Sequence, residues 1–136
     1  MAMPTKYSVA VMVRNGSNVL AVRRPDDDDE LPGIWGLPAG SYRVGESLDD
    51  LISRIGRNKL DVKFTPMRLL KRGAQDRLQY RLEMELWEAS IEGAPGRGQW
   101  KWAPLDMLRL GAASGSLCCH LALVDSHQNQ SAEHRD

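Results

Sequence analysis

The sequence has few residues that bind metal through sulfur or imidazole, with two cysteines and three histidines among 136 residues. Cys118 and Cys119 are adjacent, and a disulfide between neighbouring residues would be strained. Two cysteines cannot supply the four ligands of a structural zinc site, and the neighbouring His120 has no second ligand cluster at a suitable spacing. We therefore expect reduced thiols in the core, where free cysteine is most often found, and no zinc site.

The sequence also has no excess of positive or negative charge and no long apolar run. Lys and Arg number 18 and Asp and Glu number 18, so anion binding needs a local arrangement, and no overall field recruits nucleic acid. No apolar run approaches the roughly 18 residues of a membrane span, and residues 1–13 do not resemble a signal peptide. We expect a cytoplasmic protein without a nucleic-acid or membrane partner. The oligomeric state stays open, with a homodimer as one option.

The length is that of one ordinary domain, which buries about two thirds of its unfolded surface. Residues 1–125 are predicted to form this single domain, with a closing helix over residues 116–124. Residues 126–136, SHQNQSAEHRD, carry no apolar stripe. They are predicted to be a polar, disordered C-terminal tail.

The N-terminal part predicts a β-hairpin followed by an acidic loop. Residues 7–13 and 18–24 are rich in β-formers, and the Asn-Gly pair between them favours a hairpin turn. Residues 25–30, PDDDDE, then break the sheet, because five like charges repel one another. We expect a solvated, mobile loop here rather than a cation site, because flexible carboxylates are not preorganised.

Periodicity predicts one helix and two antiparallel strands in the middle of the chain. Residues 48–59 carry an apolar stripe at helical spacing, with Ser47 as the predicted N-cap. Residues 78–86 alternate between apolar and polar, which predicts a strand with one buried face. Residues 62–72 are its expected partner, with Pro66 at a bulge or edge. These elements indicate an α/β protein.

The most specific motif lies between Trp35 and Val62. Residues 35–40 read WGLPAG, and Gly40, Glu46 and Arg54 have the spacing G-x5-E-x7-R. With the order of elements, this resembles the Nudix (MutT-type) family over residues 5–125. The resemblance implies an α/β/α sandwich with a mixed β-sheet and a loop-helix-loop whose Glu side chains bind magnesium or manganese for diphosphate hydrolysis. Glu46 and Arg54 are about two helical turns apart and are expected to pair, which gives this half of the motif a structural role.

The second half of the motif, E-U-x-E-E-x-G-U with U a bulky aliphatic residue, is not retained. The three Glu positions are occupied by Ile55, Asn58 and Lys59. Ile55 has no donor atom for a metal, Asn58 offers a neutral carbonyl, and Lys59 is a cation. Gly56 replaces the aliphatic residue, and Asp61 replaces the glycine that ends the helix. We expect metal-dependent hydrolysis to be lost or much weakened. We assign no metal cofactor, and magnesium or manganese is expected only if residual hydrolase activity exists. The sequence does not assign catalytic residues.

Three functions stay open. The first is binding of a nucleotide or another phosphorylated ligand, related to nucleoside-diphosphate-linked compounds, through Arg23, Arg24 and Lys59, with Trp35 stacking on a base. The second is a divergent hydrolase that uses carboxylates outside the motif, from a reserve formed by Glu46, Glu83, Glu85, Asp106 and residues 26–30. The third is a protein-interaction module with a vestigial pocket. We rank ligand binding or residual hydrolysis first, because the resemblance points to phosphate compounds, although fold alone does not establish function.

Overall fold

The structure, a computed structural model, describes residues 3–133, with side chains described as far as Ser126. Its centre is a four-stranded sheet in the order β5-β1-β7-β6. β1 and β7 are parallel and the other two pairs are antiparallel, which confirms the mixed sheet. β6 carries register shifts next to Pro66, at the bulge that the sequence predicts. The strands of this sheet are β1 (Thr5–Met12), β5 (Ala39–Ser41), β6 (Lys63–Asp76) and β7 (Arg81–Glu92).

A second, smaller sheet consists of short strands, in which β3 pairs with β2, β4 and β8. These strands are β2 (Arg14–Asn15), β3 (Asn18–Arg23), β4 (Trp35–Gly36) and β8 (Trp100–Pro104). The predicted hairpin forms only at its tip, where Gly16 has φ 62° and β2 pairs with β3. β1 instead enters the central sheet, because it is apolar on both faces: Val9 and Val11 belong to one core, and Ala10 and Met12 to the other.

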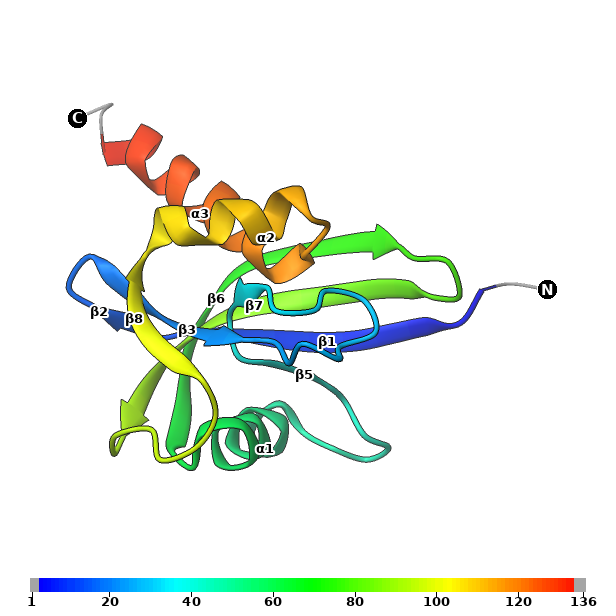
Figure 1. The fold of residues 1–136 in the computed structure, drawn as a ribbon, viewed down its shortest axis with the longest axis horizontal. Helices are drawn as coiled ribbons and strands as arrows, with labels where there is room; N and C mark the ends of the chain where they lie inside the picture. The colour runs from blue at the N-terminus through cyan, green and yellow to red at the C-terminus, as the bar shows by residue number, and fades with distance from the viewer. Residues whose placement is uncertain (1–2, 134–136) are drawn as a thin grey trace.

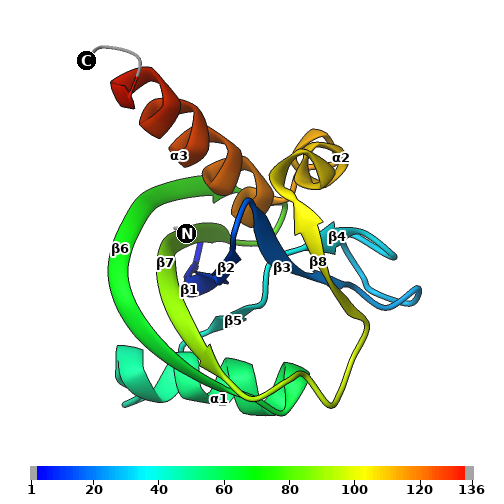
Figure 2. The ribbon, with the colours of Figure 1, turned by 90° about the vertical axis from the view of Figure 1, so that its left-hand side faces the viewer.

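Helices cover both faces of the central sheet (Figures 1 and 2), which confirms the α/β/α sandwich. α1 (Leu48–Leu60) lies on one face and packs on a core that contains Leu51, Ile52 and Phe64. The helices on the other face are η1 (Leu105–Leu108), α2 (Arg109–Ala113) and α3 (Leu117–Glu133). Among the described residues, no helix is both long and apolar enough to cross a bilayer.

Two predicted boundaries differ from the structure. The strand expected over residues 78–86 is β7, Arg81–Glu92, and its second half packs through its other face, because Trp87 and Ile91 lie on the core that contains α1 while Ser90 is exposed. α3 continues past Val124 to Glu133, into the segment for which we expected a disordered tail. Residues 134–136 of that segment lie outside the described part.

α1 begins and ends as its local sequence indicates. The Ser47 hydroxyl accepts a hydrogen bond of 3.1 Å from the Asp50 amide, so Ser47 is the N-cap. Asp61 ends the helix in the left-handed conformation, with φ 57°, and its amide donates to the carbonyl of Arg57. The helix is therefore intact over the segment that carries the altered motif.

Candidate functional site

A cavity of about 440 Å³ is lined by both sheets and by the ends of two helices. The wall from the central sheet includes Ser8 and Met84, and the wall from the smaller sheet includes Val22. The C-terminal end of α1 and the first turn of α3 complete it. Segments far apart in the sequence therefore meet at one site.

Arg23 and Arg24, two of the residues assigned to ligand binding, both line this cavity. Arg23 ends β3, where its side chain donates a hydrogen bond of 3.2 Å to Gln99 Oε1. Gly33 has φ 70°, which favours glycine, and it lies against this guanidinium, where an added β-carbon would be 2.8 Å from Arg23 Nη2. The loop after β3 therefore packs against Arg23.

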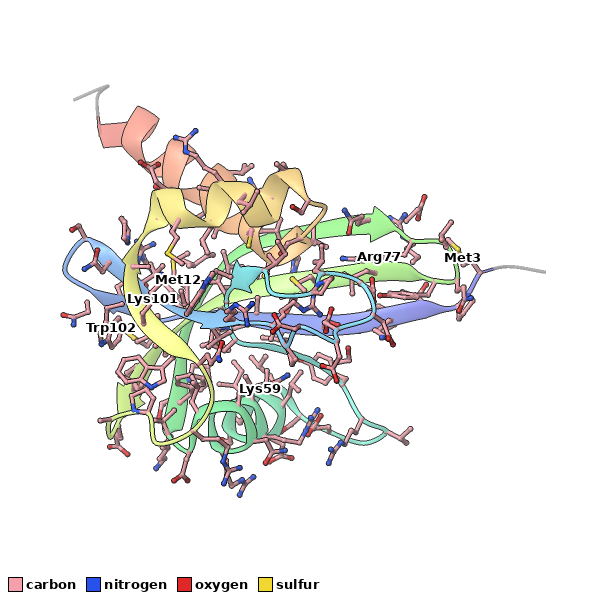
Figure 3. The ribbon with its side chains drawn as sticks, viewed as in Figure 1. Met3, Met12, Lys59, Arg77, Lys101 and Trp102 are labelled. Atoms are coloured by element: carbon pink, nitrogen blue, oxygen red, sulfur yellow. The ribbon has the colours of Figure 1, made fainter. Side chains whose placement is uncertain are left out.

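Lys59 is the third assigned residue that lines the cavity. It is exposed near the end of α1, on the side of the helix that faces the strands (Figure 3), and no ion pair among the described side chains involves it. The loop of residues 93–98 packs on this helix end, where a β-carbon on Gly98 would lie 2.8 Å from the Lys59 carbonyl oxygen. The same loop brings Arg97 to the cavity wall, and Arg97 Nη1 donates to the Asn58 carbonyl at 3.4 Å.

The cavity is cationic although the whole chain is neutral. Two acidic side chains, Asp28 and Glu30, are among the residues that line it. The basic lining residues are Lys6, Arg23, Arg24, Lys59, Arg77 and Arg97. This excess of positive charge is the local arrangement that the balanced composition requires for anion binding.

Glu46 and Arg54 form the predicted pair at the start of α1. Arg54 Nε donates to Glu46 Oε2 at 2.8 Å, and Arg54 Nη2 donates to Glu46 Oε1 at 2.9 Å. These bonds from Arg54, followed by one from the Arg43 amide, lower the pKa of Glu46 to about 2. Arg54 also donates to the Ser41 carbonyl at 2.7 Å. Glu46 thus holds the loop on the helix, and its two oxygens are engaged by Arg54.

Ile55 is a core residue. Its side chain is 2% exposed, and a β-carbon on Gly40 would lie 3.0 Å from Ile55 Cγ1. Gly56 is required by packing as well, because its β-carbon would lie 2.8 Å from the Val62 carbonyl oxygen and 2.9 Å from Phe64 Cδ2. The altered helix face is therefore closely packed against the loop that precedes α1 and the strand that follows it.

Comparison with solved structures identifies the fold. A MutT protein from Methanosarcina mazei Go1 is 17% identical, with TM-score 0.79 over 95% of this chain and 98% of that one. A Nudix hydrolase from Nitrosomonas europaea is 18% identical, with TM-score 0.75 over 93% and 90% of the two chains. The chain has the Nudix fold. No protein-family model and no curated protein matches the sequence. A UDP-X diphosphatase shares this fold at 16% identity, with TM-score 0.70 over 95% of this chain and 66% of that one.

The motif helix of this Nudix-fold chain does not fit a divalent metal. Ile55 is buried and has no donor atom, while Lys59 places a cation at the cavity wall. The backbone carbonyl of Asn58 accepts from Arg97, and its side chain offers one neutral oxygen. Within the described residues, no group of three or more His, Cys, Asp or Glu side chains is arranged to hold a metal ion.

Trp35 does not line the cavity, although its neighbours Ile34 and Gly36 do. The Lys101 ammonium lies 4.3 Å from the centre of the Trp35 ring, in a cation-π contact between β4 and β8. The structure therefore brings Arg23, Arg24 and Lys59 together at the cavity. Trp35 is the direct partner of Arg23 in the pairing of β3 with β4, but it is not among the residues that line the cavity.

Sequence reasoning did not find several residues of the cavity. Lys6 lies over the Tyr80 ring at 4.6 Å, and Arg77, which also lines the cavity, follows β6 and lies away from α1 (Figure 3). Only the pairing of β1 with β7 brings Lys6 into this wall, so no local motif marks it. Arg97 has a weak signal, since it is the one cation of the loop sequence GAPGRG.

The two cysteines lie at the start of α3. Cys119 is buried, as expected, whereas Cys118 is partly exposed and lines the cavity. Hydrogen bonding with Cys119 and with the Ser116 hydroxyl lowers the pKa of the Cys118 thiol, and the same contact with Cys118 raises the pKa of Cys119. Ser116 Oγ lies 3.3 Å from Cys118 Sγ.

Three of the reserve carboxylates line a second cavity, of about 730 Å³, beside the start of α1: Glu46, Glu83 and Glu85. Each is already paired. Arg72 Nε lies 2.8 Å from Glu85, Arg81 Nε lies 3.6 Å from Glu83, and Arg54 holds Glu46. Asp106, another residue of this reserve, pairs with Arg109 at 3.0 Å. The structure thus brings three carboxylates to one cavity, but each of them already forms an ion pair with an arginine.

Proposed function

We propose that the chain binds a nucleotide or another phosphorylated small molecule in the cationic cavity, and that metal-dependent diphosphate hydrolysis through the motif helix is lost or much weakened. The observation that carries this proposal is Lys59, an exposed cation without an ion-pair partner among the described side chains, on a cavity wall shared with Arg23, Arg24 and Arg97. Ammonium and guanidinium groups bind phosphate directly, and the arginine fork does so with two parallel hydrogen bonds.

Size and polarity support the same class of ligand. A volume of about 440 Å³ lies within the range of small-molecule sites, roughly 300–1,000 Å³. The walls also offer apolar side chains, Leu82 and Met84 among them, against which a base or another uncharged group can pack. A solved structure with this fold is described as a UDP-X diphosphatase, so a nucleoside-diphosphate-linked compound is the first ligand to test.

Isothermal titration with nucleotides, ADP-ribose and inorganic pyrophosphate, each with and without magnesium, tests the proposal. We expect saturable binding of at least one diphosphate in the absence of magnesium. Absence of binding for the whole panel under both conditions would remove the proposal.

A divergent hydrolase is the second candidate, because Glu46, Glu83 and Glu85 line one cavity. Glu83 has the weakest ion pair of the three, at 3.6 Å to Arg81, and is the carboxylate with most freedom to act. Magnesium-dependent phosphate release that is abolished by Glu83→Gln and survives Glu46→Gln would favour this function. No turnover on a broad panel of diphosphates would rule it out.

A further inference from the structure

The acidic loop after β3, residues 25–32, is largely exposed, as its charge predicts, but it has a defined conformation beside the cationic cavity. Asp28 Oδ2 accepts hydrogen bonds from the Leu31 amide at 2.8 Å and the Glu30 amide at 3.2 Å. The Gly33 amide donates to the Pro25 carbonyl at 3.1 Å, which closes the base of the loop, and Leu31 is 6% exposed. The loop thus has a defined conformation anchored by one apolar side chain.

Three carboxylates of this loop are bound to arginines of the cavity. Asp26 pairs with Arg23 at 2.5 Å, and Asp28 pairs with Arg24 at 3.4 Å. Glu30 pairs with Arg77 and also accepts a hydrogen bond of 2.9 Å from the Tyr80 hydroxyl. Arg23, Arg24 and Arg77 are all cavity-lining residues, so half of the six cations of the site are engaged by one segment of the chain.

Carboxylate and phosphate oxygens use the same guanidinium N–H donors. A phosphorylated ligand and the loop therefore compete for Arg23, Arg24 and Arg77. Most of these groups are at least partly exposed, with Asp26 84% and Arg24 43% exposed, and exposed ion pairs of this kind are weak. A ligand that carries several charges can displace the pairs, while Lys59, which has no pair to break, offers a first contact.

We infer that the acidic loop is an internal competitor of the phosphate site: its carboxylates occupy the arginines that the ligand needs and leave them when the ligand binds. This inference rests on the proposed function and adds its regulation. The pKa of Asp28 lies below its ordinary value, first because the Leu31 amide donates to it, so this carboxylate also stays charged in mildly acidic solution.

The loop supplies its own matched control. Asp26→Asn with Asp28→Asn removes two carboxylates that contact cavity arginines, and the side-chain oxygen of asparagine can still accept from the Leu31 amide. Asp27→Asn with Asp29→Asn removes the same charge from the same loop, at exposed residues that have no ion pair within the described part of the chain. A long-range field acts on both variants alike, so only a competitive contact separates them.

Titration with inorganic pyrophosphate at low salt, with thermal unfolding to check each fold, tests the inference. We expect the 26/28 variant to bind about fivefold or more tightly than the 27/29 variant, and this ratio to fall at high salt. Hydrogen exchange at the Leu31 and Gly33 amides of the unaltered chain should accelerate when pyrophosphate is bound. Equal affinities of the two variants, or weaker binding by the 26/28 variant, would overturn the inference while leaving the proposed function in place. Absence of pyrophosphate binding in all three proteins would also overturn the inference, while the proposed function would still be decided by titration with the nucleotides and ADP-ribose.

Discussion

Ile55 and Gly40 are packed so closely that a β-carbon on Gly40 would lie 3.0 Å from Ile55 Cγ1. This contact joins the loop before α1 to the helix position where the Nudix motif has its first missing glutamate. The missing glutamate is therefore replaced by a packed core residue, because Ile55 is 2% exposed and belongs to the hydrophobic core. Restoring the motif residue means replacing a core side chain by a charge.

Ile55→Glu is expected to lower the free energy of unfolding by about 3 kcal/mol or more, since it buries a carboxylate without a partner. Ile55→Val, the control, is expected to cost about 0.5–1.5 kcal/mol. Urea denaturation measures both. A glutamate variant as stable as the valine variant would show that position 55 is open to solvent.

Gly56→Ala is expected to destabilise the protein by about 1–3 kcal/mol, although the same change in an ordinary helix stabilises by about 1 kcal/mol. The reason is the added β-carbon, which would lie 2.8 Å from the Val62 carbonyl oxygen and 2.9 Å from Phe64 Cδ2. Asn58→Ala, on the exposed face of the same helix, is the control and should be neutral or slightly stabilising. A gain in stability for Gly56→Ala would mean that the helix and β6 are less tightly packed than described.

The Glu46–Arg54 pair should make stability depend on pH in the acidic range. The pKa of Glu46 falls from 4.5 to about 2 on folding, so the pair stabilises the fold fully above the unfolded value. This contribution is lost as the pH falls towards the folded value. The stability difference between the unaltered chain and Glu46→Gln should therefore be constant near neutral pH and shrink from about pH 4.5 to pH 2. Asp49→Asn provides the comparison, and a difference that does not change over this range would contradict the pairing.

Lys59→Ala is expected to weaken binding of a diphosphate ligand by about tenfold or more, as for loss of one charged hydrogen bond. Arg57→Ala is the matched control, because Arg57 is a cation of the same helical turn that does not line the cavity. Titration calorimetry should give a change below about twofold for the control. Equal effects of the two substitutions would indicate a general charge effect instead of a contact with Lys59.

The features that sequence reasoning found are those whose partners lie close in the chain. The Ser47 cap and the Glu46–Arg54 pair follow from spacing along one loop and helix, and the structure confirms both. Arg23, Arg24 and Lys59 were assigned because the order of elements resembles that of a known fold, and they do meet at one cavity.

The features that sequence reasoning missed depend on distant partners. The run of carboxylates at residues 26–30 is largely exposed, as expected, but its own repulsion does not predict the ion pairs that give the loop a defined conformation. Arg23 and Arg24 pair with Asp26 and Asp28 locally, but the partner of Glu30, Arg77, lies 47 residues further along the chain, after a strand whose register no local pattern gives. The cation-π contact of Trp35 likewise needs Lys101 from β8, which reaches it only through the pairing of β8 with β3. Long-range strand pairing decides these contacts.

The central claim is that a phosphorylated ligand is held by cationic side chains without a metal at the motif helix. A crystal structure of the protein soaked with pyrophosphate and manganese tests it most directly, because manganese is located by its anomalous signal. We predict phosphate oxygens within hydrogen-bonding distance of Lys59 Nζ and no manganese between residues 46 and 59. A manganese ion bound to that segment, with pyrophosphate coordinated to it, would contradict the account.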